Sequence, residues 1–185
     1  MPILGTIASQ FSGKPSSSFE SIATTTVGSG GQDIVEFTSI PQTFKHLQLR
    51  FMFKNNDTGS FNNSPMRFNN ASSGYFEHYL TSDTAVNATG GANLGAFNTI
   101  IWAASTSLNA NVFSTGVVEI LDYSSASKRK VVRSYGGGNN NTTGIIWLHS
   151  GLFDSLDTVS SIQIDTGGQM VSENSEFALY GIKGA

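Results

Sequence analysis

The sequence predicts an all-β protein, an antiparallel β-sandwich that is jelly-roll-like and has a short extended N-terminal arm. Ser, Thr, Asn and Gly make up 78 of the 185 residues, and these residue types suit turns and exposed strand faces better than helices. Short segments of alternating polarity recur between turn residues, whereas no convincing 3.6-residue period is present. We expect the arm at residues 1–18 and one β-sandwich domain at residues 19–185.

The arm is expected to reach a neighbouring molecule. Its apolar residues Ile3, Leu4, Ile7 and Phe11 are separated by glycine, proline and serine, which break any regular element. An arm of this kind is either frayed or laid onto a neighbouring molecule, and the four isolated apolar side chains favour the second interpretation. The segment has no charged residue before Lys14 and no continuous apolar run, so we expect no signal peptide.

The first two strands of the sandwich are expected at residues 19–27 and 32–39. The glycine-rich stretch GSGG at residues 28–31 separates them, and such a stretch is typical of a tight hairpin connection. Pro41 ends the second strand, because proline lacks the amide proton that the ladder needs.

The clearest strand is LQLRFMFK at residues 47–54. Leu47, Leu49, Phe51 and Phe53 share one face of this segment and predict a strand with one buried side. The remaining strands are expected, by the same alternation and by the turn residues between them, at residues 66–70, 75–81, 97–103, 116–123, 128–135, 144–150, 160–165 and 177–185.

Two polar stretches are predicted to be connections. Residues 81–96 form the longest stretch of low hydrophobicity and are expected to be a loop at one end of the sandwich. GGGNNN at residues 136–141 is expected to be a turn, since no phosphate-binding signature follows it. The closing strand is expected to complete a sheet.

Composition excludes several functional classes. Charged residues are 12% of the chain and the net charge is −3, which disfavours nucleic-acid binding. The chain has no cysteine, so disulfides and thiolate metal sites are excluded. No apolar run is long enough for a membrane helix, so no membrane insertion is expected.

Signals for catalysis are weak, and we expect neither an enzyme nor a bound cofactor or metal. His46, His78 and His149 lie in separate predicted elements without metal-ligand spacing. No Gly-x-Ser-x-Gly elbow is present. A glycan-degrading enzyme that uses paired carboxylates remains a third hypothesis.

Two groups of residues are candidates for binding. Lys128, Arg129, Lys130 and Arg133 form either a solvated hairpin corner or a docking patch for an acidic partner. Trp102 and Trp147 lie in strongly apolar segments and are expected in the core. The aromatic residues near Asn- and Ser-rich segments are candidate receptor or glycan contacts: Phe61, Tyr75 and Tyr79.

Several segments together carry a family resemblance, which runs from about Ser18 to the end of the chain. They are SFESIATTTVGSGG, FTSIPQTFKHLQLR, GVVEILDYSSASKRKVVRSYGG, SGLFDSLDTVSSI and FALYGIKGA. In these segments the chain resembles small virion structural proteins of tailed bacteriophages of aquatic bacteria, cyanophages among them. The middle of the chain, residues 55–110, matches least.

The resemblance implies a non-enzymatic structural protein on the outside of the virion, as a capsid decoration (cement) protein or a tail appendage. Its expected partners are copies of itself, as a homotrimer, and capsid or tail proteins, after assembly in the host cytoplasm. The arm residues Ile3, Leu4, Ile7 and Phe11 are expected to attach it to the particle. The alternative is a receptor- or carbohydrate-binding module of a tail fibre or spike that binds a host surface glycan.

Overall fold

The described residues form β-strands joined by turns. The computed structural model describes residues 18–83 and 85–184, and within these ranges it has twelve strands and no helix. No helix that is long and apolar enough to cross a membrane occurs in this part of the chain. The prediction of an all-β fold is confirmed.

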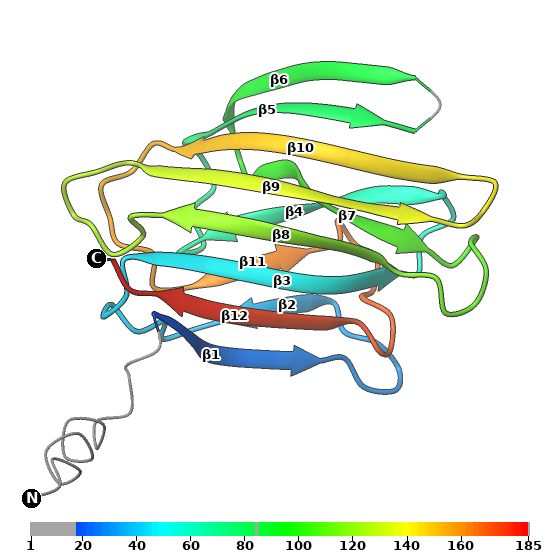
Figure 1. The fold of residues 1–185 in the computed structure, drawn as a ribbon, viewed down its shortest axis with the longest axis horizontal. Coiled ribbons are helices and arrows are strands. Elements are labelled where there is room, and N and C mark those ends of the chain that lie inside the picture. The colour runs from blue at the N-terminus through cyan, green and yellow to red at the C-terminus, as the bar shows by residue number, and fades with distance from the viewer. Residues whose placement is uncertain (1–17, 84, 185) are drawn as a thin grey trace, which may run out of the picture.

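The strands form two antiparallel sheets, one behind the other (Figure 1). The larger sheet contains, in spatial order, β1 (Phe19–Thr26), β12 (Glu176–Ile182), β3 (His46–Asn55), β8 (Ser114–Leu121), β9 (Lys130–Asn139), β10 (Gly144–Phe153), β5 (Tyr75–Ser82) and β6 (Val86–Leu94). The smaller sheet contains β2 (Ile34–Phe37), β11 (Ile162–Asp165), β4 (Phe61–Phe68) and β7 (Phe97–Ser105). A short parallel contact between the ends of β3 and β7 joins the two sheets.

The order of pairing is that of a jelly roll. Strands near the start of the chain pair with strands near its end: β1 with β12 in the larger sheet and β2 with β11 in the smaller one. The next two pairs, β3 with β8 and β4 with β7, follow the same rule. The hairpins β9–β10 and β5–β6 extend the larger sheet beyond β8, so that β1 and β6 are its two edges (Figure 1).

The core lies between the sheets, as the alternation in β3 predicts. Leu47, Leu49, Phe51 and Phe53 are all buried. Two clusters of aromatic rings fill most of this space, and each fully buried ring of this size contributes about 1.5–3 kcal/mol. The clusters consist of Phe51, Phe53, Trp147 and Phe177, and of Phe68, Tyr75, Phe97 and Phe153.

The predicted hairpin across residues 28–31 is wrong. The strand before this stretch pairs with β12 and the strand after it pairs with β11, so the stretch crosses from the larger sheet to the smaller one. Alternation indicates which face of a strand is buried but not which strand lies next to it. The glycine-rich stretch therefore predicted a hairpin between two strands that do not pair with each other.

Two predicted connections are also wrong in part. Residues 81–96 include strand β6, which pairs with β5 from Ser82–Val86 to Tyr75–Leu94. β6 is an edge strand with nearly every residue exposed, and most of its alternation is between small residues such as Ala88 and polar ones such as Asn87, which predicts a strand only weakly. Gly136, Gly137 and Gly138 lie inside β9 rather than in a turn. The closing strand β12 is an interior strand, placed between β1 and β3.

Candidate functional site

A groove of about 690 Å³ opens between the two sheets, beside the β5–β6 hairpin. Its walls come from β4 and β7 of the smaller sheet and from β5, β6 and β10 of the larger sheet. The lining residues are Ser60, Phe61, Tyr79, Thr81, Asp83, Asn87, Ala88, Thr89, Trp102, Thr143 and Ile145. We call this site the intersheet groove.

The aromatic residues of the intersheet groove are held in place by their surroundings. The indole Nε1 of Trp102 donates a hydrogen bond to the carbonyl of Thr99 at 3.0 Å. The ring of Phe61 lies directly against Gly138 of β9, where a Cβ would approach the ring to 2.5 Å. Two of the three aromatic residues therefore have an orientation that is set before any ligand binds.

Two of the three predicted glycan contacts lie in the intersheet groove. Phe61 and Tyr79 line the same groove although they come from different sheets. The prediction for Tyr75 is wrong, because its side chain is fully buried and its hydroxyl accepts a hydrogen bond from the Phe68 amide at 2.8 Å. Burial raises the pKa of the Tyr75 hydroxyl above its ordinary value.

Trp102 is a lining residue that sequence reasoning missed. It lies in the segment TIIWAA of β7, whose residues are mostly buried on both faces, so the local pattern predicts a core position. The structure leaves Trp102 half-buried at the groove. No signal in the sequence distinguishes this position from its buried neighbours, whereas Trp147 is buried in the core as expected.

Five of the large apolar side chains exposed on the outer face of the larger sheet lie close together on β5, β6, β9 and β10. Leu80, Leu148 and Tyr135 are direct neighbours across β5, β10 and β9, and Val86 and Ile146 flank the end of β5. Their exposed fractions run from 44% for Leu80 to 71% for Val86. We call these five residues the apolar face.

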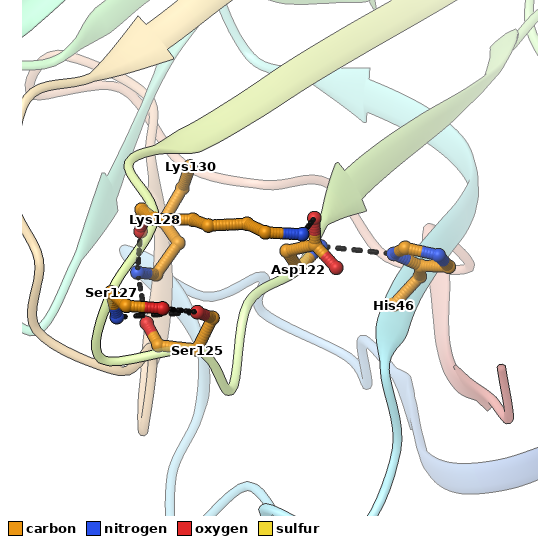
Figure 2. A network of polar contacts seen from close by, with 6 residues as sticks. All are labelled: His46, Asp122, Ser125, Ser127, Lys128 and Lys130. Carbon is orange, nitrogen blue, oxygen red and sulfur yellow. Dashed lines mark hydrogen bonds and ion pairs between the residues drawn. The ribbon is translucent and has the colours of Figure 1, made fainter.

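The basic cluster does not present four free charges. The Lys130 side chain is buried, and its Nζ donates hydrogen bonds to the carbonyls of Ser125 and Lys128 at 2.6 Å (Figure 2). It also donates to the carbonyl of Leu156 at 3.4 Å. The prediction that Lys130 belongs to a docking patch is therefore wrong. Burial lowers the pKa of Lys130, and the nearby carboxylates of Asp157 and Asp122 oppose this effect.

The other three basic residues are exposed and paired with carboxylates. Lys128 contacts Asp122 at 3.0 Å, as Figure 2 shows. The remaining ion pairs are Arg129 with Asp154, and Arg133 with Glu119 at 2.9 Å. These pairs neutralise the positive charge on which the docking interpretation depends.

The three histidines have different environments. Nδ1 of His46 accepts a hydrogen bond from the Asp122 amide at 2.9 Å (Figure 2). His78 is exposed on β5, whereas His149 is buried beside Glu77 at 3.1 Å. Among residues 18–83 and 85–184, no group of three His, Cys, Asp or Glu residues is placed to hold a metal ion.

The residues of the predicted attachment arm, Ile3, Leu4, Ile7 and Phe11, lie outside the described residues. No protein-family model matches the chain, and no curated protein matches it either.

Proposed function

We propose that this protein is a non-enzymatic structural protein of a bacteriophage particle, which assembles on the outside of the virion through contacts between its own copies. The observation that carries the proposal is the apolar face. Exposed apolar surfaces that extend over several strands are typical of protein–protein contacts. The expected assembly is a closed homotrimer that attaches to capsid or tail proteins.

Strand β10 indicates that the apolar face is buried in a contact with another subunit. Its segment IIWL, residues 145–148, is apolar on both sides, a pattern typical of strands that are buried on both faces. Ile145 and Trp147 point into the core and are buried. Ile146 and Leu148 point outward and are exposed by 66% and 59% in the single chain. Contact with another subunit would bury this second side.

The charges near the apolar face favour a second copy of the chain as its cover. Arg133 and Glu119, which lie on the same outer face, already pair with each other. The surface therefore has no unpaired charge at this position that would select an acidic or basic partner. A second copy presents the same apolar surface, and homo-oligomer interfaces are more apolar than the rest of the surface.

The placement on a phage particle rests on the resemblance and on the fold class. Jelly rolls are found in viral capsid proteins and also in lectins and cupins. The fold is therefore compatible with a virion protein but does not by itself distinguish these classes of protein. The segments that resemble virion proteins include the interior strand β12 and the β8–β9 hairpin. These elements belong to the sheet that also presents the apolar face.

Self-association can be tested by light scattering coupled to size-exclusion chromatography. We expect the wild-type protein to elute as an oligomer and the double variant Ile146→Ser, Leu148→Ser to elute as a monomer with unchanged circular dichroism. Leu156→Ser is the matched control, because Leu156 is also exposed, by 49%, but lies outside the apolar face. A monomeric wild-type protein, or a double variant that still associates, would contradict the proposal.

The location can be tested by quantitative mass spectrometry of purified particles. Closed symmetry ties copy number to position, so roughly hundreds of copies indicate a capsid decoration and a few tens indicate a tail appendage. Absence of the protein from purified particles would overturn the virion assignment and leave self-association unaffected.

A further inference from the structure

We propose that the intersheet groove binds a neutral saccharide. The inference does not depend on assembly, because the groove lies between the two sheets whereas the apolar face lies on the outer surface of the larger sheet. Its volume of about 690 Å³ is within the range of small-ligand sites, which is roughly 300–1,000 Å³.

The aromatic residues of the groove match the apolar faces of sugar rings. Phe61, Tyr79 and Trp102 approach the groove from three different strands, β4, β5 and β7. A pyranose ring exposes a face of C–H groups, which packs against an aromatic ring, while its hydroxyls point outward around the rim. Tyr79 combines such a face with a phenolic hydroxyl that can bind a sugar hydroxyl.

Neutral hydrogen-bonding groups surround these rings. Asn87, Thr89 and Thr143 supply an amide and two hydroxyls, each of which can donate and accept hydrogen bonds. The Asn87 amide nitrogen donates to the Ala85 carbonyl at 3.2 Å, which orients the side chain. Sugar hydroxyls also both donate and accept, so the two sets of groups are complementary.

The charge of the groove selects against acidic sugars. Asp83 is the single charged residue among the described residues that line it, and no lysine or arginine is present there. A sulfated or carboxylated sugar would meet a carboxylate of like charge at Asp83. The same observation favours binding over cleavage, because paired-carboxylate glycoside hydrolysis needs two carboxyl groups within about 5–10 Å of each other.

The groove is also arranged for binding at a low entropic cost. The Trp102 indole is held by its hydrogen bond to Thr99, and the Phe61 ring is held against Gly138. Rings that are already ordered lose little conformational freedom when a ligand packs on them.

The test is an array that carries neutral hexose and N-acetylhexosamine glycans together with sulfated and sialylated ones, probed with the full chain. Neutral hits are then titrated by calorimetry. We expect Asn87→Ala to weaken binding by about threefold to tenfold through loss of a hydrogen bond. We expect Tyr79→Ala to weaken it by at least about tenfold through loss of ring contact.

Tyr180→Ala is the matched control, since Tyr180 is a partly exposed aromatic residue that belongs neither to the apolar face nor to the lining of the intersheet groove. It should bind neutral glycans as the wild-type protein does. Circular dichroism and thermal melts verify that Tyr79→Ala and Asn87→Ala remain folded. Binding restricted to acidic glycans, binding unchanged in both groove variants, or no binding on the array would each overturn the inference.

Discussion

At the scale of single residues, glycines decide where aromatic rings fit against the larger sheet. Gly136 lies inside β9, opposite Trp147 of β10. A Cβ at this position would overlap the Trp147 ring and the carbonyl oxygen of Thr115. The missing side chain therefore allows the indole to pack directly against the strand, which explains why a glycine run occurs within a strand.

We predict that Gly136→Ala destabilises the protein by about 3 kcal/mol, at the upper end of overpacking effects, because the backbone oxygen of Thr115 cannot move away easily. Gly28→Ala is the control, since a Cβ there would meet no atom within 4 Å. Urea denaturation measures both variants. Equal stability of the two would show that the ring and the strand separate at little cost.

A second prediction at this scale concerns acid stability. The hydrogen bond from Lys128 holds the pKa of Asp122 below its ordinary value. The stability contributed by the charged carboxylate is present above the unfolded pKa of about 3.9 and is lost as the pH falls through the lower folded pKa. Wild type should therefore lose more stability than Asp122→Asn over this acid range.

Urea denaturation between neutral pH and acid measures this difference. The effect should be small, because Lys128 is largely exposed and solvent screens the pair. When Lys128→Met is added to both proteins, most of the difference between wild type and Asp122→Asn should disappear. Parallel stability curves for wild type and Asp122→Asn would contradict the prediction.

At the scale of elements, the β5–β6 extension is anchored by one buried carboxylate. Oε2 of Glu77 accepts hydrogen bonds from the amides of Asn98 and Thr99 at 3.0 and 3.3 Å. The same oxygen contacts Nε2 of His149 at 3.1 Å. Glu77 therefore ties β5 of the larger sheet to β7 of the smaller sheet and to β10, next to the intersheet groove.

We predict that Glu77→Leu destabilises the protein by roughly 3 kcal/mol, since each buried donor left without an acceptor costs about 1–3 kcal/mol. Glu77→Gln retains an acceptor oxygen of similar position and should cost less than half as much. Thermal and urea denaturation compare the two variants. If Leu and Gln were equally destabilising, the hydrogen bonds would not be the cause.

At the scale of the whole molecule, the jelly roll pairs strands from opposite ends of the chain. β1 and β12 are direct neighbours although they are separated by nearly the whole sequence. Such non-local pairings form only after long loops have closed, which costs entropy before the contacts stabilise the fold.

We predict that refolding is slow, on a scale of about milliseconds to seconds, as for other folds dominated by non-local strand pairing. Stopped-flow dilution from urea, followed by tryptophan fluorescence, measures the rate, because Trp147 is buried between the sheets. Removal of residues 176–185 should prevent folding, since β12 lies between β1 and β3. Folding in microseconds, or a folded truncated chain, would contradict this expectation.

The sequence by itself determined the fold class and the buried face of β3. Both depend on local properties: residue types that favour strands and turns, and the two-residue period of Leu47, Leu49, Phe51 and Phe53. It did not reveal β6, because this exposed edge strand consists mostly of small and polar residues, which resemble those of a loop. It also did not reveal which strands pair, since alternation is the same for any neighbour.

Only the tertiary structure decided the binding surfaces. Tyr75 and Tyr79 point to the same side of β5, yet Tyr75 is covered by Phe97 and Phe153 whereas Tyr79 lines the intersheet groove. Likewise, Lys130 is buried while Lys128, two residues earlier, is exposed. The physical reason is that burial depends on which distant strand or loop lies above a residue, and the local pattern of a strand does not contain that information.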